Sequence, residues 1–225
     1  MYVVVAAYNE ADRIGATLGA LTVAFPGTQV WVADDGSSDG TSEIALGAGA
    51  RVVRCERMLG KGEAVTWAAR EALAEARRAS EGAAVFVLCD GDLAGSASEL
   101  GALSDVVARG EADIAVAAFA RRVGGGMGIA LAFARWAIRR RCGLEVGAPI
   151  SGQRALSEES LEDVLPLAHG YGMEIGMTID AVRAGRRLVE VELNLSHRAT
   201  GRTLTGFLHR GSQMQDFIRV YLARR

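Results

Sequence analysis

The chain has 225 residues, half of them apolar and 23% charged, which is enough to bury the core of one α/β domain. Its formal net charge of -2 gives no general argument for a nucleic-acid partner, and the absence of a run of about eighteen apolar residues argues against a membrane span. The three cysteines, Cys55, Cys89 and Cys142, form no CxxC motif, which argues against a disulfide framework or zinc site and favours a cytoplasmic protein.

The first half of the chain alternates between short apolar runs and longer stretches of helical period. The runs, rich in β-branched residues, are Tyr2–Ala6, Val30–Ala33, Arg51–Arg54, Ala84–Cys89 and Asp113–Ala117. The helical stretches between them are marked by Ile14, Leu18 and Leu21 and by Ala64, Trp67, Ala68, Glu71 and Ala72. Apolar strands separated by helices predict an α/β fold with a mostly parallel sheet covered on both faces. We expect Thr41 and Ser96 to be helix N-caps.

The alternation weakens after about residue 120. Residues 121–128, RRVGGGMG, form a glycine-rich break typical of a mobile loop. After it, Gly128–Arg141 predicts a helix, Leu188–Leu195 a strand, and Thr203–Arg225 a C-terminal amphipathic helix. No linker or repeat interrupts the chain, so we expect a single domain over 1–225 with a nucleotide-handling part at about 1–120.

Two like charges follow the predicted strand Ala84–Cys89. Asp90 and Asp92 are separated only by Gly91, at the carboxyl end of a strand, where open α/β sheets bind ligands. Carboxylates this close repel each other unless a positive charge lies nearby, and Mg²⁺ or Mn²⁺ suits such oxygen ligands. Gly91 lets the backbone approach a ligand closely. Because Asp-Gly is also a common turn former, a solvated turn stays open as the alternative.

Polar side chains also follow the second predicted strand, in VWVADDGSSDGT at 30–41. Asp34 or Asp35 can accept hydrogen bonds from a ribose hydroxyl or a base, although a capped turn would use the same residues. Further on, the segment GKG at 60–62 places Lys61 at a helix N-terminus. That is a natural place for a phosphate or a nearby acid, and a merely solvated lysine is the alternative.

Taken together and in order, four segments resemble glycosyltransferase family 2. They are VVVAAYNEADRI at 3–14, VADDGSSDGT at 32–41, GKGEA at 60–64 and CDGDLAG at 89–95. The resemblance implies a GT-A fold, which is a Rossmann-like, mostly parallel sheet flanked by helices. It also implies a nucleotide-diphosphate sugar donor and Mn²⁺ or Mg²⁺. The family's D-x-D motif binds the metal and the donor, so Asp92 would be a metal ligand and a catalytic residue, while Asp90 and Gly91 would face the ribose.

The same resemblance implies further donor contacts. The first-strand motif of the family usually reads proline, two variable residues, asparagine and glutamate. This chain carries Ala6, Ala7, Tyr8, Asn9 and Glu10, with alanine where the proline is usual. We therefore expect Ala6, Ala7, Tyr8 and Glu10 to line the donor site. Asp35 would reach the base or the ribose, and Lys61 the edge of uracil or guanine.

The second half resembles the acceptor-side segments of the same family, through SGQRAL at 151–156 and HGYGMEIGMTIDA at 169–181. The nearest members are glucosyl-3-phosphoglycerate synthases and dolichyl- or polyprenyl-phosphate glycosyltransferases. In the former, a Tyr-Gly-x-Glu stretch lines the site and a later histidine completes the metal shell. Residues 171–174 and His197 match that pattern. The residues implied for the acceptor and the diphosphate are Ser151, Gly152, Tyr171, Gly172, Arg198 and Arg202.

Four of these residues keep alternative interpretations. Glu174 would orient an acceptor hydroxyl or act as its general base, or it would only stabilise a helix N-terminus. His197 would bind the metal, or it would be a turn residue at a strand end. Arg198 and Arg202 would hold a diphosphate through forked hydrogen bonds, or they would be solvated surface residues.

These features predict a metal-dependent enzyme that moves a sugar from a UDP- or GDP-sugar to an acceptor such as 3-phosphoglycerate. One alternative is a polyprenyl-phosphate glycosyltransferase, whose basic amphipathic helices would lie on the inner membrane face rather than form core contacts or a dimer surface. Another is a nucleotide-sugar-binding module without turnover. A sugar-phosphate nucleotidyltransferase would need a glycine-rich basic loop after the first strand, where this chain has AAYNEADR.

Overall fold

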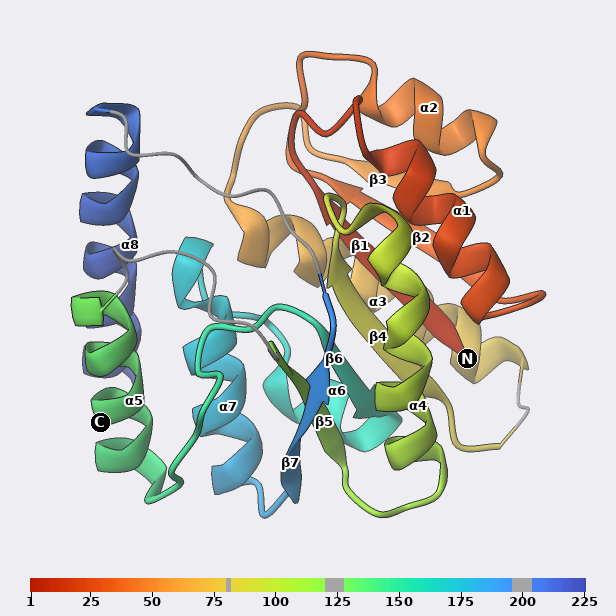
Figure 1. The fold of residues 1–225 in the computed structure, drawn as a ribbon. Helices are drawn as coiled ribbons and strands as arrows, with labels where there is room; N and C mark the ends of the chain where they lie inside the picture. Colours follow the sequence, from red (N-terminus) through yellow and green to blue (C-terminus); the bar gives the residue numbers. More distant parts are fainter. Residues whose placement is uncertain (80–81, 120–127, 196–203) are drawn as a thin grey trace.

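The computed structural model describes residues 1–79, 82–119, 128–195 and 204–225 (Figure 1). The first half holds β1 (Tyr2–Ala7), α1 (Ile14–Ala24), β2 (Gln29–Asp34), α2 (Thr41–Gly47), β3 (Arg51–Arg54), α3 (Lys61–Ala79), β4 (Val85–Asp90), η1 (Ala94–Leu100), α4 (Gly101–Ala108) and β5 (Ile114–Phe119). The second half holds α5 (Gly128–Cys142), β6 (Arg154–Ser157), α6 (Glu158–Val164), η2 (Gly170–Gly172), α7 (Met173–Arg183), β7 (Leu188–Leu193) and α8 (Leu204–Ala223).

The strands form one seven-stranded sheet in the order β3-β2-β1-β4-β6-β5-β7. All pairs are parallel except those of β6, which runs antiparallel to both β4 and β5. The expected α/β class and mostly parallel sheet are confirmed. The sequence did not predict β6, because a run of only four residues, RALS, with a polar residue at each end does not indicate a buried strand.

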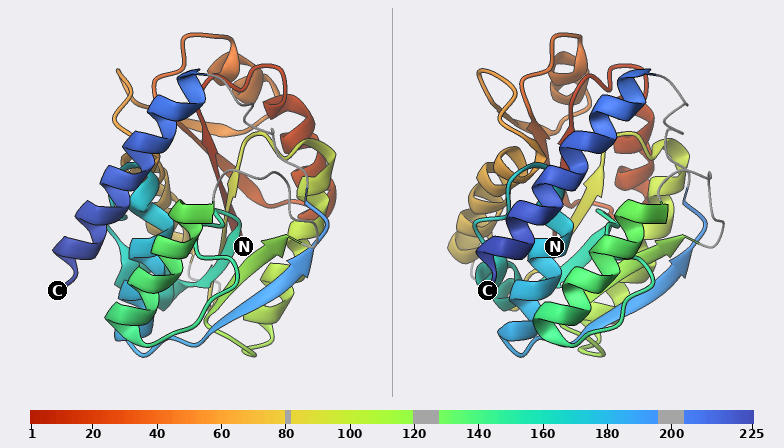
Figure 2. Two further views of the ribbon diagram at one scale, coloured as in Figure 1. Left: turned by 60° about the vertical axis from the view of Figure 1, so that its left-hand side comes forward. Right: turned by 90° about the vertical axis from the view of Figure 1, so that its left-hand side faces the viewer.

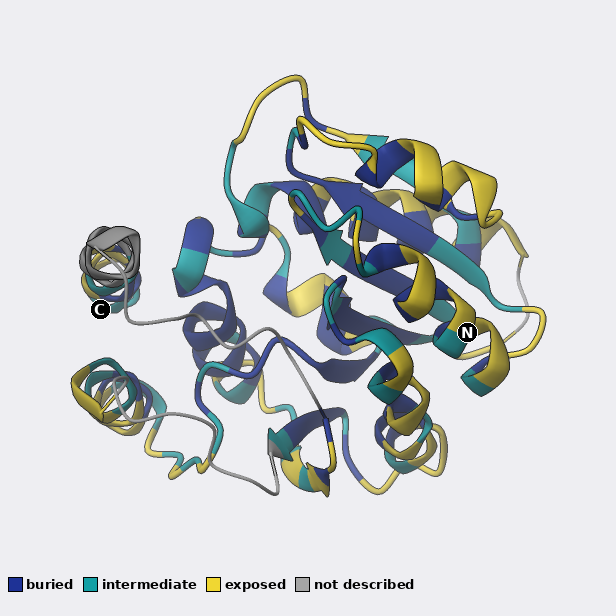
Figure 3. Cartoon of the chain, turned by 45° about the horizontal axis from the view of Figure 1, so that its top comes forward, coloured by how far each residue is buried: buried dark blue, intermediate teal, exposed yellow. Residues whose placement is uncertain are grey.

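Successive residues of the central strands enter two separate cores, because side chains alternate across a sheet. On one face, Val3 and Val5 pack under α1, η1 and α4. On the other face, Val4 packs with residues of α3, α6 and α7. Both helical layers are visible in Figure 1, and Figure 3 shows dark, buried strands between helices whose outer surfaces are exposed. The central strands are therefore apolar throughout, as parallel strands covered on both faces must be.

A third apolar cluster joins α5, α7 and α8 at the side of the sheet (Figure 2). Its centre is formed by Ala134, Ile138, Ile175, Ile179, Phe217 and Val220. Glycines let α8 come close to η2 and α7: a Cβ on Gly172 would overlap Val220 Cγ2, and one on Gly176 would lie 2.8 Å from Arg224 Nη2. The close packing of η2 and α7 against the C-terminal helix therefore requires glycine at these two positions.

Several local predictions need correction. Thr41 is the first residue of α2 rather than its N-cap, because its hydroxyl accepts a hydrogen bond from the Glu10 amide. Ser96 lies inside η1, and its hydroxyl donates to the Leu93 carbonyl. The expected strand Leu188–Leu195 ends at Leu193. The expected mobile loop falls on residues 120–127, which lie outside the described residues, and Gly128 already opens α5.

Within the described ranges, no helix combines the length and the apolar character that crossing a lipid bilayer requires.

Candidate functional site

The candidate site lies where the carboxyl ends of β1, β2 and β4 meet the beginnings of α3, β6 and α7. Because β6 runs antiparallel to β4, its first residue, Arg154, pairs with Leu88 near the end of β4. Residues 151–153, which lead into β6, therefore reach the same edge of the sheet as Asp90. This edge is where doubly wound sheets bind their ligands.

One lysine joins two carboxylates at the centre of this edge. Lys61 Nζ lies 2.7 Å from Asp90 Oδ1 and 2.8 Å from Glu174 Oε1. The Glu174 side chain is only 7% exposed, whereas that of Asp90 is 32% exposed, so the group opens to solvent on the Asp90 side. Burial lowers the pKa of Lys61, but the Asp90 and Glu174 charges outweigh it and raise that pKa above its ordinary value. Lys61 is therefore held as a cation.

The segment before β6 completes the surroundings of this group, which we call the Lys61 triad (Lys61, Asp90 and Glu174). Gln153 Nε2 donates to Asp90 Oδ2 over 2.6 Å, and Gln153 is nearly fully buried. At Gly152, an added Cβ would lie 2.6 Å from Lys61 Nζ, so any side chain would displace the ammonium. Ser151 is buried next to them, and its hydroxyl donates to Gln153 Oε1.

The turn that carries Asp90, Gly91 and Asp92 is fixed through its backbone. The Gly91 amide donates to the Ala6 carbonyl over 2.8 Å, and Thr17 Oγ1 donates to the Gly91 carbonyl over 2.7 Å. Arg13 Nη1 donates to the Asp92 carbonyl over 3.0 Å. These bonds fix the backbone of the turn against β1, against α1 and against Arg13, the residue before α1. Two carboxylates on one rigid turn supply the hard oxygen donors that Mn²⁺ and Mg²⁺ prefer.

The loop after β1 is tied to the loop after β2. The Asn9 amide donates to Ser37 Oγ over 2.9 Å, and the Ser38 amide donates back to Asn9 Oδ1 over 2.8 Å. Asn9 has a φ of 55°, a left-handed conformation that asparagine tolerates. The loop thereby presents Tyr8, which is 45% exposed, at the rim of the site.

The two aspartates after β2 are both engaged within the protein. Asp34 is fully buried and accepts hydrogen bonds from the Ser37 amide and the Ser42 hydroxyl. Asp35 accepts from the amides of Leu59 and Gly60, and so holds the turn that opens α3. Asp35 thus positions the helix that carries Lys61. Its expected contact with a base or ribose stays a prediction.

The segment that leads into α7 is anchored by α8. The Tyr171 amide donates to Oδ2 of the buried Asp216 over 3.2 Å. Gly170 has a φ of 54°, and a Cβ there would overlap the same carboxylate. Burial raises the pKa of the Tyr171 phenol; the Lys61 charge lowers it, and the Asp216, Glu174 and Asp35 charges raise it further. Tyr171 therefore lies within electrostatic reach of the Lys61 triad, with Gly172 next to it at the start of α7.

The structure brings together several of the residues expected from sequence at the site. Lys61, Asp90, Gly152 and Glu174 meet directly, with Ser151, Tyr171 and Gly172 around them. The predicted ligand His197, together with Arg198 and Arg202, lies outside the described residues. In the part of the chain that is described, no three His, Cys, Asp or Glu side chains gather as a metal-binding group.

Sequence reasoning missed Gln153 and Arg154 as parts of this edge. The available signal was their place in SGQRAL, where two long polar residues directly precede a short apolar run. In the structure the side-chain amide of Gln153 is hydrogen-bonded to Asp90.

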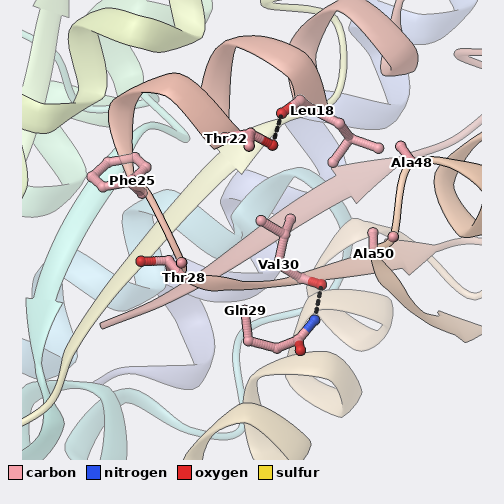
Figure 4. A pocket seen from close by; sticks show the side chains of 10 residues that line it. Leu18, Thr22, Phe25, Thr28, Gln29, Val30, Ala48 and Ala50 are labelled. Carbon is pink, nitrogen blue, oxygen red and sulfur yellow. Dashed lines mark hydrogen bonds between the residues drawn. The ribbon is translucent and has the colours of Figure 1, made fainter.

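A pocket of about 280 Å³ lies elsewhere, at the start of β2 (Figure 4). Its lining residues are Leu18, Thr22, Phe25, Gly27, Thr28, Gln29, Val30, Ala48, Gly49 and Ala50. None of them carries a charge, and the pocket is at the end of β2 opposite to Asp34. It therefore offers no chemistry for a charged substrate, and the edge with the Lys61 triad stays the candidate site.

A scan against protein families matches residues 2–165 to the family described as "Glycosyl transferase family 2". Among curated proteins, the undecaprenyl-phosphate mannosyltransferase of Micrococcus luteus is 30% identical over 215 residues, covering 88% of this chain and 84% of the relative. The glucosyl-3-phosphoglycerate synthase of Mycolicibacterium paratuberculosis is 32% identical over 203 residues, covering 79% of this chain and 58% of the relative. The polyprenol monophosphomannose synthase of Mycolicibacterium smegmatis is 29% identical over 214 residues, covering 88% of this chain and 78% of the relative.

Among solved structures, glucosyl-3-phosphoglycerate synthase from Mycobacterium tuberculosis is similar over nearly the whole chain. Its complex with Mn²⁺, UDP-glucose and phosphoglyceric acid has a TM-score of 0.76 at 29% identity, covering 99% of this chain and 78% of that protein. Its complex with Mg²⁺ and UDP has a TM-score of 0.75 at 30% identity, covering 99% of this chain and 78% of that protein.

Proposed function

This chain belongs to glycosyl transferase family 2, and on that premise we propose that it moves a hexosyl group from a UDP-sugar to a small phosphate-bearing acceptor. The observation that carries the proposal is the Lys61 triad, which joins the turn after β4 to the first turn of α7. A similar protein binds Mn²⁺, UDP-glucose and phosphoglyceric acid. We treat 1–225 as one domain, in which about 1–120 binds the donor and about 121–225 the acceptor.

Mn²⁺ or Mg²⁺ would be held by Asp92, with Asp90 beside it on the rigid turn and His197 from outside the described residues. The carboxylate oxygens and the fixed backbone of the turn fit such a cation. The bound cation would offset the negative charge of the departing diphosphate. Similar proteins contain Mn²⁺ or Mg²⁺ together with UDP.

The chain's own residues divide the remaining work. Ala6, Ala7, Tyr8 and Glu10 line the donor side with Asp35, Asp90 and Gly91. Lys61 stays charged and places a preorganised positive charge beside the diphosphate. Glu174, which is fixed at the start of α7, orients the acceptor hydroxyl and accepts its proton as the new bond to the sugar forms.

The acceptor would lie between the segment before β6 and the segment before α7. Ser151 and Gly152 form one wall, and Tyr171 and Gly172 form the other. Arg198 and Arg202 would bind its phosphate through forked hydrogen bonds. An acceptor such as 3-phosphoglycerate has both the hydroxyl and the phosphate that this arrangement requires.

The test is UDP release from UDP-glucose, with 3-phosphoglycerate and Mn²⁺, measured against the same reaction in excess chelator. We expect chelator and Asp92→Asn each to lower the rate by about 100-fold or more. The matched control is Asp105→Asn on the exposed side of α4, which should keep the rate. Binding of UDP-glucose in a thermal-shift assay without any UDP release would instead support the non-catalytic binding module. A parallel GDP-glucose series identifies the base.

A specific surface favours polyprenyl phosphate as a second acceptor class. The aromatic patch, formed by Phe133 and Trp136 of α5 and Tyr221 of α8, leaves Trp136 about half exposed. Ile129, one helical turn before Phe133 on α5, is exposed as well. Arg141 stacks over Tyr221 at 3.7 Å, and the same last turn of α5 carries Arg139 and Arg140. Aromatic and apolar side chains next to basic ones suit an anionic lipid surface.

This second candidate places the protein on the cytoplasmic face of a membrane, whereas burial of the same patch in a homodimer would compete with it. The test is flotation with vesicles of phosphatidylglycerol at low salt. Trp136→Ala should reduce the floated fraction, whereas Trp67→Ala, a control of similar exposure on α3, should not. Wild-type protein that stays at the bottom of the gradient contradicts the membrane candidate, and a concentration-dependent dimer in sedimentation would explain the patch.

A further inference from the structure

Arg154 is a fully buried arginine in the middle of the sheet. It opens β6, and its sheet partners are Leu88 of β4 and Val116 of β5. Both partners belong to the apolar core on the α7 face, as does Leu156 two residues later. The guanidinium is thus inserted among aliphatic side chains.

This placement is costly for a charged group. Among the described residues, no carboxylate lies within ion-pair distance of Arg154, and its Nη2 has no hydrogen-bond partner. Burial lowers the pKa of the guanidinium to about 10, against the raising effect of the Glu174 and Glu190 charges. A methionine or leucine would fill the space without this penalty, so packing alone does not account for an arginine here.

The two hydrogen bonds of Arg154 lead to opposite walls of the candidate site. Nε donates over 2.9 Å to the Ser151 carbonyl, one residue before Gly152. Nη1 donates over 2.9 Å to the Thr178 hydroxyl, and that hydroxyl donates over 2.9 Å to the Glu174 carbonyl. The guanidinium therefore bridges the segment before β6 and the first turn of α7.

We propose that Arg154 is a positioning residue that fixes Gly152 and Glu174 relative to each other. The bridge holds the Glu174 carboxylate at Lys61 and keeps the Gly152 backbone against the same ammonium. Arg154 contacts no substrate and acts only through these two segments. The inference rests on the proposed function, since it assigns Arg154 a part in that transfer reaction.

The experiment measures kcat and donor KM for Arg154→Met, for Arg154→Lys and for Thr178→Val, in the wild-type and in the Glu174→Gln background. In the wild-type background, Arg154→Met should lower kcat about 100-fold while donor KM changes less than about threefold. Arg154→Lys should recover part of kcat, since it keeps the charge. Thr178→Val should lower kcat about tenfold, because it breaks one arm of the bridge. In the Glu174→Gln background, all three should have little further effect, because they act through Glu174.

Ser160→Ala is the matched control, since it removes another fully buried hydroxyl, on α6, with no connection to the site. It should lower the melting temperature without changing kcat. Equal losses of kcat in both Glu174 backgrounds would overturn the inference, and Thr178→Val decides the question if Arg154→Met fails to fold. Wild-type protein that transfers no sugar refutes the proposed function, whereas an active wild type without this dependence on Glu174 refutes only the role of Arg154.

Discussion

Lys61 and Glu174 are 113 positions apart in the sequence, yet Lys61 Nζ lies 2.8 Å from Glu174 Oε1. The contact joins the first residue of α3 to the first turn of α7. Because Asp90 binds the same ammonium from the other side, one cation connects the turn after β4 with the acceptor-side helix. The two parts of the site that we propose for the donor and the acceptor are therefore joined by a single side chain.

Removing this cation should separate the two parts. Lys61→Met leaves the largely buried Glu174 carboxylate without its partner, and we expect kcat/KM for UDP release to fall about 100-fold or more. The pKa of Lys61 is raised, so its stabilising contribution is complete below the ordinary lysine value and is lost only as the pH rises through the higher folded value. The contribution of Lys61 to the free energy of unfolding should therefore stay constant between pH 6 and pH 9. Because Lys61→Met also leaves Glu174 unpaired, the comparison is made in the Glu174→Gln background, where a stability difference that varies across this window would contradict the prediction.

Gly152 should tolerate no side chain. A Cβ there would lie 2.6 Å from Lys61 Nζ and 3.3 Å from Glu174 Oε1, so Gly152→Ala must push the ammonium out of its place. We expect activity to fall at least about tenfold, with a change in the free energy of unfolding below about 1 kcal/mol because the lysine tip can move. The control is Gly101→Ala at the start of α4, where a Cβ meets nothing within 4 Å. Activity equal to that of the control would show that the ammonium position is unimportant.

Gln153 should matter through Asp90. Gln153→Leu keeps the approximate volume but removes the amide that donates to Asp90 Oδ2 over 2.6 Å. Loss of such a supporting hydrogen bond is expected to weaken Mn²⁺ binding. The half-saturating Mn²⁺ concentration should therefore rise about tenfold. The measurement is a Mn²⁺ titration of UDP release. An unchanged titration midpoint would mean that Asp90 is oriented without Gln153.

The docking of α8 should depend on Gly172. Gly172→Ala places a methyl group against Val220 Cγ2, and we expect the free energy of unfolding to fall by about 1–3 kcal/mol. Val220→Ala removes the opposing methyl groups, so the double variant should be more stable than the sum of the two single losses predicts. Chemical denaturation of the four proteins measures this. Strictly additive losses would show that the two residues do not touch.

A stability prediction concerns the connection between α7 and β7. Asp113 accepts hydrogen bonds from the Arg187 amide and guanidinium, and these lower the pKa of its carboxyl group. A lowered pKa contributes stability above the ordinary aspartate value, and that contribution is lost as the pH falls through the lower folded value. Asp113→Asn should thus cost about 1 kcal/mol at pH 7, because solvent screens the exposed Arg187. The difference should shrink as the pH falls below the ordinary aspartate pKa of about 3.9. An equal difference at pH 3 and pH 7 would contradict it.

The donor half of the fold could be predicted because its signals are local. Strands such as β1 and β4 are continuous apolar runs, and the polar residues directly after them mark the edge where ligands bind. The position of Lys61 at the start of α3 followed from the glycine on each side of it. The helix caps failed because Thr41 is used for a contact with Glu10, a pairing between loops that one strand's sequence does not reveal.

The second half of the fold was predicted less completely, because its strands and helices are positioned by contacts between residues far apart in the sequence. The four residues of β6 become a strand only because β4 and β5 pair with them on both sides. The role of Gln153 appears only when β6 is placed antiparallel to β4. Similarly, the sequence alone does not explain the glycines of η2 and α7. They are needed because the C-terminal helix packs directly against their backbone.

The reversed direction of β6 has a consequence for how this scaffold can diversify. Its neighbours deliver their loops to the ligand edge after each strand, whereas β6 delivers residues 151–153 before its strand begins. Exchanging the connection from α5 to β6 would therefore alter the surroundings of Asp90 and Lys61 as well as those of Glu174, because Gly152 and Gln153 contact them. A graft of this connection between relatives must therefore keep Gly152 and Gln153 if the contacts of Lys61 and Asp90 are to be retained.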